Sequence, residues 1–153
     1  MAKKGHLCLM AIEQAIPNTI ITELQNKLNA LGYNPLPEKV SANRLQFKSD
    51  QGKQLEVLLL PLNLDKARSI SINQREFNYT PRPDLWILLV VTMNDLEPAP
   101  YLIPSIVFNA PNDIFLNHEQ PPALQHFSTW EIKVFTRAIP ELSRYALDST
   151  VDL

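Results

Sequence analysis

The feature that most constrains the fold is an unbroken apolar run at residues 85–91, Leu-Trp-Ile-Leu-Leu-Val-Val. Pro83 precedes this run and Asn94 follows it closely, so the run is far too short to cross a bilayer and has the length of a strand. A second run, Val-Leu-Leu-Leu-Pro-Leu at residues 57–62, also lacks polar side chains. A strand that is apolar on both faces must be covered on both faces. The chain is therefore predicted to fold around a largely buried β-sheet.

The N-terminal part of the chain is predicted to be helical. One set of apolar residues recurs at helical spacing: Ile20, Ile21, Leu24, Leu28 and Leu31. Gly32 follows directly and supplies the left-handed residue that ends helices, so we expect a helix over residues 19–31. Residues 6–16 fit either a mostly buried helix or a strand, and helix is the preferred interpretation.

Two antiparallel hairpins are predicted. Residues 44–48 alternate between polar and apolar, and a polar turn containing glycine separates them from residues 54–62. The buried strand at residues 84–93 is followed, across a proline-containing turn, by residues 101–108 as its antiparallel partner. Pro104 restricts this last strand to a bulge or a sheet edge, because proline has no N–H to donate to a neighbour.

The remaining segments are less regular. Residues 63–83 have no steady period and predict a long irregular connection, and residues 109–128 predict a polar loop with one apolar island. Residues 130–135 alternate as a short strand, and Pro140 marks the start of a closing helix. The expected fold is α+β or mixed α/β, with a mostly antiparallel central sheet of about four to five strands flanked by helices.

Composition indicates one soluble domain over residues 1–153. With 45% apolar residues, a chain of 153 residues can bury a single core without disulfides or metals. The single cysteine, Cys8, cannot form an internal disulfide, which favours a reducing, cytoplasmic compartment. No stretch has the length of about 20 apolar residues that crosses a membrane, so no membrane contact is expected.

The usual catalytic motifs are absent from the sequence. The chain has only 3 glycines, which leaves no glycine-rich phosphate loop. Among the three histidines, His118 and His126 share a polar loop with Glu119, but without a metal-binding spacing they are interpreted as solvated loop residues. Ser105 follows a proline, and no motif places a histidine beside it. The sequence therefore contains no complete catalytic set.

Charge is distributed unevenly along the chain. The formal net charge of −2 argues against nucleic-acid binding through overall charge. Residues 37–82 nevertheless hold eight Lys or Arg residues against five acids, whereas residues 111–153 hold three against six. This balance predicts a mildly basic surface, which is either a solvated face or a surface that contacts phosphates. The candidate phosphate contacts are Lys66, Arg68 and Arg75.

Several segments together carry a family resemblance. They are Leu-Gly-Tyr-Asn at residues 31–34, the first hairpin, the run at residues 83–91, and Pro-Tyr-Leu-Ile-Pro-Ser at residues 100–105. Their order resembles the restriction-endonuclease-like, or PD-(D/E)XK, nuclease superfamily. The resemblance implies an endonuclease-like core over residues 5–108, followed by a C-terminal loop, short strand and helix over residues 109–153.

The resemblance also implies where a nuclease site would lie. In that superfamily the first hairpin strand carries a metal-binding Asp. The second carries an acidic residue or Gln followed, one residue on, by Lys, and the two acidic ligands hold Mg²⁺. Here residues 43–48 contain no acid, and Glu56 is followed by Leu58. The resemblance thus implies the fold, whereas these residues oppose the reaction, and no metal ligand is assigned.

Three functions are compatible with these observations. The preferred one is a non-catalytic nuclease-fold domain that acts as a binding or assembly module, with nucleic acid or a protein as its partner. The second is a divergent metal-dependent nuclease with migrated ligands, in which Glu13, Asp50 or Glu56 would hold Mg²⁺.

The third is a protein-interaction module unrelated to nucleic acid. Two observations favour it: the excess of acidic over basic residues in the chain, and three aromatic residues expected to be exposed in loops, namely Phe77, Tyr79 and Phe115.

Overall fold

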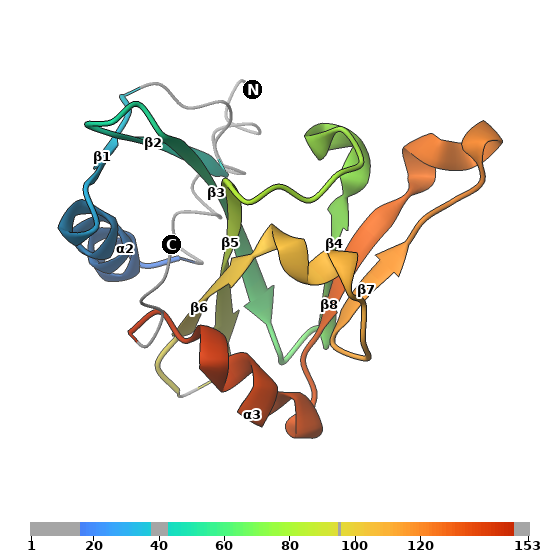
Figure 1. Ribbon diagram of the computed structural model, residues 1–153. Helices are drawn as coiled ribbons and strands as arrows, with labels where there is room; N and C mark the ends of the chain where they lie inside the picture. The colour runs from blue at the N-terminus through green and yellow to red at the C-terminus, as the bar shows by residue number, and fades with distance from the viewer. Residues whose placement is uncertain (1–15, 38–42, 95, 149–153) are drawn as a thin grey trace, which may run out of the picture.

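The computed structural model describes residues 16–37, 43–94 and 96–148 and arranges them in three layers. The helix α2 (Asn18–Ala30) covers one face of a five-stranded sheet, and a three-stranded sheet covers the other face (Figure 1). The segment 6–16, predicted as a helix, lies almost wholly outside the described residues. Within the described ranges, no helix is long and apolar enough to span a membrane.

The five-stranded sheet has the order β1-β2-β3-β5-β6. Its strands are β1 (Tyr33–Pro35), β2 (Arg44–Ser49), β3 (Gln54–Asn63), β5 (Leu85–Thr92) and β6 (Ala99–Pro104). Both predicted hairpins are present, because β2 pairs antiparallel with β3 and β5 pairs antiparallel with β6. The two hairpins are joined by β3 and β5, which run parallel over eight residue pairs from Glu56–Leu85 to Asn63–Thr92. The sheet is therefore mixed: three of its four strand pairings are antiparallel as predicted, whereas the central parallel pairing was not predicted.

The two apolar runs form the centre of the molecule, and each is buried on both faces. On β3, the side chains in the core below the three-stranded sheet are Leu58, Leu60 and Leu62, and those in the core below α2 are Leu55, Val57 and Leu59. β5 alternates in the same way between the two cores. This double burial is the physical reason that neither run contains a polar side chain.

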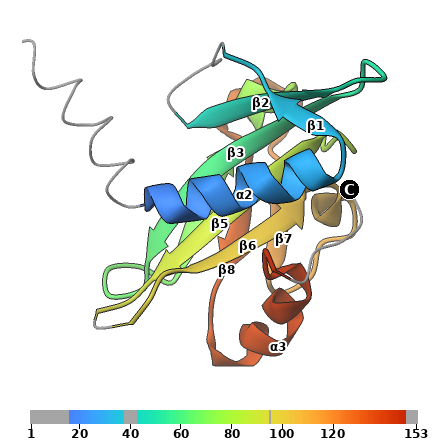
Figure 2. The same ribbon diagram turned by 90° about the vertical axis from the view of Figure 1, so that its left-hand side faces the viewer.

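The predicted helix is confirmed as α2, which begins one residue earlier than expected and ends one residue earlier. Ile20, Leu24 and Leu28 are buried on one face of the helix, which lies across the strands of the sheet (Figure 2). Gly32 follows with φ +94°, a left-handed conformation that glycine adopts without steric cost. The chain then turns directly into β1.

The second sheet was not predicted. It has the order β4-β8-β7, with β4 (Ser69–Asn73), β8 (Thr129–Lys133) and β7 (Phe115–His118), and all its pairs are antiparallel. Of its strands, only β8 was expected. The central sheet was predicted to be flanked by helices, but on this face it is covered by the second sheet instead. Because β8 pairs with β4, the C-terminal segment shares a sheet with residues from the middle of the chain.

Short turns complete the fold. They are η1 (Gln74–Phe77), η2 (Ser105–Asn109), η3 (Pro122–Phe127), η4 (Thr136–Ala138) and η5 (Ser143–Tyr145), together with the short helix α3 (Ile139–Leu142). β6 ends at Pro104, so the expected strand over residues 101–108 finishes as the 3₁₀ turn η2 instead. The closing helix is present, with Pro140 in its first turn.

Aromatic rings fill the space between the two sheets. Trp130 stacks on Phe108, with ring centroids 5.2 Å apart, and also on Phe77, with centroids 6.1 Å apart. Phe115 meets Phe108 edge to face at 6.0 Å. Phe77 and Phe115 are 3% and 1% exposed, so the prediction that they lie exposed in loops is wrong. Both are core residues, because the segments that carry them pack into the second sheet.

Candidate functional site

Glu56, a candidate ligand of the nuclease hypothesis, sits in a cluster of charged residues. It is 8% exposed on β3, and its two carboxylate oxygens have different partners. The Nε of Arg44 donates to Oε2, and an Nη2 of Arg82 donates to Oε1 at 3.2 Å. Arg82 is also within 3.5 Å of an oxygen of Asp84. The cluster thus balances two arginines against two acids.

The sheet brings these residues together from distant points of the chain. Arg44 pairs with Leu58, which makes Glu56 its diagonal neighbour on the same face of the hairpin. The parallel pairing of β3 with β5 places the start of β5 beside Glu56, whose N–H donates to the carbonyl of Asp84 at 2.8 Å. The guanidinium of Arg44 also lies 4.7 Å from the Phe77 ring centroid, a cation–π contact.

A buried serine fixes the second arginine. The backbone N–H of Arg82 donates to Oγ of Ser105 at 3.0 Å, and the same hydroxyl donates to the carbonyl of Arg82 at 2.7 Å. Ser105 is 0% exposed. Its hydroxyl is therefore fully used in holding the loop before β5.

This geometry does not resemble a metal site. A hard divalent cation takes several oxygen ligands, and here two guanidinium groups already occupy both oxygens of Glu56. Asp50 lies in the hairpin turn, on the order of 10 Å along the hairpin from Glu56. Glu13 lies outside the described residues. Across the described part of the chain, no group of three or more His, Cys, Asp or Glu side chains is placed to hold a metal ion.

The three candidate phosphate contacts are split between the two ends of β4. Lys66 and Arg68 are exposed just before β4, where the Arg68 carbonyl accepts from the N–H of Val134 at 2.8 Å. Lys133 joins them, because its Cα pairs with that of Ser69. Arg75 lies in η1 beyond the other end of β4, about 20 Å away along the strand. The structure thus brings together Lys66 and Arg68 but not Arg75.

His118 and His126, the histidines among the described residues, likewise have separate partners. On the outer face of the second sheet, Nε2 of His118 lies 2.8 Å from Oε1 of Glu131. This hydrogen bond, followed by one from Ser69, holds the pKa of the Glu131 carboxyl below its ordinary value. The ring of His126 instead lies against Phe127, with centroids 4.0 Å apart.

The most exposed apolar side chains of the second sheet lie in residues 119–128, which we call the η3 loop. It connects β7 to β8 and, drawn in orange in Figure 1, projects from the end of the three-stranded sheet. All seven residues from Pro121 to Phe127 are exposed. Leu124 is 47% and Phe127 is 63% exposed, although both are large and apolar.

Hydrogen bonds fix the base of the η3 loop. The Oγ of Ser128, a residue with no exposed surface, accepts from the N–H of Gln120 at 2.9 Å, and its N–H donates to the carbonyl of Gln125 at 2.9 Å. Below it, the buried side chain of Gln74 donates to Oδ1 of Asn117 at 2.8 Å and to the carbonyl of Thr129 at 2.9 Å. The exposed tip therefore stands on an ordered base.

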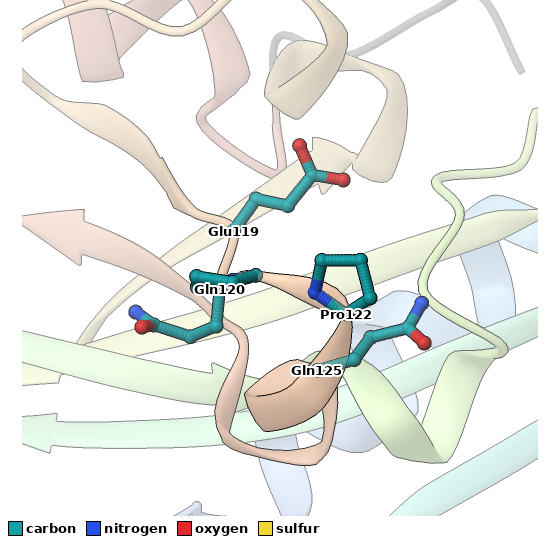
Figure 3. A pocket seen from close by; sticks show the side chains of 5 residues that line it. Glu119, Gln120, Pro122 and Gln125 are labelled. Carbon is teal, nitrogen blue, oxygen red and sulfur yellow. The ribbon is translucent and has the colours of Figure 1, made fainter.

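A shallow hollow lies on the η3 loop itself. It is lined by Glu119, Gln120, Pro121, Pro122 and Gln125. The amide groups of Gln120 and Gln125 point to opposite sides, and the carboxylate of Glu119 points away from both (Figure 3). A small-molecule site needs polar groups that converge on one ligand, so this hollow lacks the geometry of such a site.

The sequence pattern did not single out Leu124 and Phe127, because they were part of a segment expected to be a polar loop. The available signal was two large apolar residues shortly after Pro121-Pro122, in a segment with no strand or helix period.

No protein-family model, no curated protein and no solved structure matches this chain.

Proposed function

We propose that this protein is a non-catalytic binding module and that the η3 loop is where it contacts a protein partner. The observation that carries the proposal is the combination of an ordered base with an apolar tip. Ser128 and Gln74 hold the loop from below, while Phe127 and Leu124 remain exposed.

The energetics of association favour such a loop. Burying an exposed Phe or Leu side chain in a partner contributes about 1.5–3 kcal/mol per residue. Association also costs the ordering of flexible segments, and a loop that is already hydrogen-bonded at its base avoids much of that cost. Pro121 and Pro122 further restrict the backbone before the tip. The partner expected from this surface is a protein with an apolar pocket for Phe127 and a polar rim that meets the glutamines.

The two other functions have weaker support. For a nuclease, Glu56 would have to exchange two arginine partners for a metal ion. For nucleic-acid binding, the supporting observation is the grouping of Lys66, Arg68 and Lys133, a small number of charges against a net charge of −2. The relation to the restriction-endonuclease-like superfamily stays a prediction.

Affinity capture with a matched control tests the proposal. The full-length protein, its double variant Leu124→Asp/Phe127→Asp and the control Leu96→Asp would be used to capture proteins from a native extract. Leu96 is a matched position, because it is 64% exposed against 63% for Phe127 and lies in the turn between β5 and β6. Circular dichroism would first verify that all three proteins are folded.

The expected result is a specific protein retained by wild type and by Leu96→Asp, and reduced at least about tenfold by the double variant. The purified partner should then bind wild type directly with the same ranking of variants. Equal capture by the double variant would overturn the proposal. Metal-dependent cleavage of DNA or RNA that Glu56→Ala abolishes would establish the nuclease function instead.

A further inference from the structure

The edges of the two sheets differ in whether another strand can pair with them. An edge strand exposes backbone N–H and C=O groups that pair readily with another chain, and proteins usually block such edges. In the five-stranded sheet, β1 has only three residues and ends in Pro35. β6 carries Pro100 and Pro104, and the carbonyl of Pro100 accepts from the N–H of Leu147 at 3.1 Å. Both edges of this sheet are therefore blocked.

In the three-stranded sheet, a local turn closes the β7 edge at Phe115. Asn112 folds back on Phe115, and its Oδ1 accepts from the N–H of Phe115 at 2.8 Å. The N–H of Asn112 donates to the carbonyl of Phe115 at 2.9 Å. Both backbone groups of Phe115, which an added strand would need, are thus already bonded.

The β4 edge is different. Arg68 and Gln74, on either side of β4, bond to the β8 side through Val134 and Ser128. Because hydrogen-bonded pairs alternate in an antiparallel ladder, Ile70 and Ile72 also bond to β8. The N–H and C=O groups of the alternate residues Ser69, Ser71 and Asn73 therefore point outward. Within the described part of the chain, none of these outward backbone groups has a backbone partner.

The sequence of β4 suits pairing with itself. The strand reads Ser-Ile-Ser-Ile-Asn, with no charged residue and no proline to block the edge. It is nearly palindromic about Ser71. Antiparallel pairing of two copies centred on Ser71 places Ile70 opposite Ile72 on the inner face and Ser69 opposite Asn73 on the outer face. A two-fold contact requires this kind of self-complementarity, because each residue must fit its counterpart in both directions.

We propose that β4 is a self-association edge, which pairs antiparallel with β4 of a second copy and joins the two three-stranded sheets into one six-stranded sheet. The polar outer face and apolar inner face both continue across the junction. This surface is separate from the tip of the η3 loop, so self-association through β4 can be tested independently of the proposed partner. A contact of five residues per chain is small, so we expect a dimer of roughly micromolar or weaker affinity.

Disulfide trapping tests the register directly. In the proposed pair, Ser71 faces its own counterpart with Cα atoms about 5.5 Å apart, within the range that a disulfide spans. Two copies of Ser69 would instead lie about 13 Å apart. Ser71→Cys and Ser69→Cys, each in a Cys8→Ser background, would be oxidised mildly and the covalent dimer quantified over time.

The expected result is dimer formation at least about tenfold faster for Ser71→Cys than for Ser69→Cys. Equal rates would overturn the proposal, because random collision does not distinguish the two positions.

A second measurement does not depend on cysteine chemistry. Sedimentation of the wild-type chain from about 1 to about 500 µM should show a concentration-dependent dimer. Ser71→Pro removes the central outward N–H and should abolish the dimer, whereas Ser71→Thr keeps the N–H and should retain it. A wild-type chain that stays monomeric throughout, or a dimer that survives Ser71→Pro, would contradict the proposal.

Discussion

The two sheets of this protein differ in how their faces are covered, in whether their edges can pair with another strand, and in their exposed apolar side chains. The five-stranded sheet is covered by α2 on one face and by the second sheet on the other, and both of its edges are blocked. The three-stranded sheet has one solvent-facing side, an open edge at β4 and the exposed η3 loop between β7 and β8. Both proposed contact surfaces, the β4 edge and the η3 loop, belong to the second sheet and its connection.

This difference indicates that the first sheet mainly stabilises the fold, whereas the second sheet carries the proposed binding surfaces. The side chains of β3 and β5 are almost all apolar on both faces because they form the core, and the buried acid of β3, Glu56, is neutralised by Arg44 and Arg82. The second sheet contributes aromatic rings to that core from one face and presents polar groups on the other. Substitutions should therefore separate into those that affect stability and those that affect binding.

The largest effect on stability is expected in the first sheet. Leu88 has no exposed surface and lies in the core below α2, so Leu88→Ala should lower the free energy of unfolding by about 3 kcal/mol. Leu124→Ala, in the η3 loop, should change it by less than about 0.5 kcal/mol. Urea unfolding followed by circular dichroism measures both. Similar losses at the two positions would mean that the η3 loop is part of the core.

An intermediate effect is expected from the charge cluster. Glu56→Gln leaves Arg44 without a carboxylate and Arg82 with only the exposed Asp84, which should cost about 2 kcal/mol of unfolding free energy. The control Asp84→Asn removes the exposed acid of the same cluster and should cost less than about 1 kcal/mol. If Glu56→Gln has the same free energy of unfolding as wild type, Glu56 does not hold the cluster together.

The smallest stability effect should depend on pH. The His118 hydrogen bond keeps the pKa of Glu131 lower in the folded protein than in the unfolded chain. The resulting stabilisation is present above the ordinary glutamate pKa and is lost as the pH falls through the lowered folded-state pKa. Glu131→Gln should thus be less stable than wild type by under about 1 kcal/mol at about pH 7, and equally stable once the pH lies below the lowered folded-state pKa.

Denaturant titrations at both pH values measure this difference. Glu119→Gln, in the neighbouring η3 loop, removes an exposed carboxylate and serves as the control, with an expected change in stability of less than about 0.5 kcal/mol. A Glu131→Gln difference that is the same at both pH values would show that the carboxylate charge is not responsible.

The first sheet was largely predictable from sequence because its signals are local. The apolar runs, the helix ending at Gly32 and the hairpin turn each depend on neighbouring residues, and each is present in the structure. The parallel pairing of β3 with β5 was not predictable in this way, because the two strands are separated by a second-sheet strand and a turn. Arg44 as a partner of Glu56 could have been inferred from the hairpin register, whereas Arg82 could not.

The second sheet was largely missed for a physical reason. β4 alternates serine and isoleucine over only five residues, and β7 has four residues without strict alternation. Such short segments become strands only when β8 pairs with both of them. Phe77 and Phe115 were misplaced for the same reason, since their burial depends on this distant pairing.

We propose that partner recognition resides in the second sheet, at the η3 loop, and not in the buried sheet. Hydrogen exchange of the full-length protein with and without its captured, purified partner tests it most directly. We expect slower exchange on binding at the amides of residues 119–128, with β3 and β5 unchanged because their amides are already protected. Slower exchange confined to the first hairpin or to Lys66 and Arg68, with residues 119–128 unaffected, would contradict it.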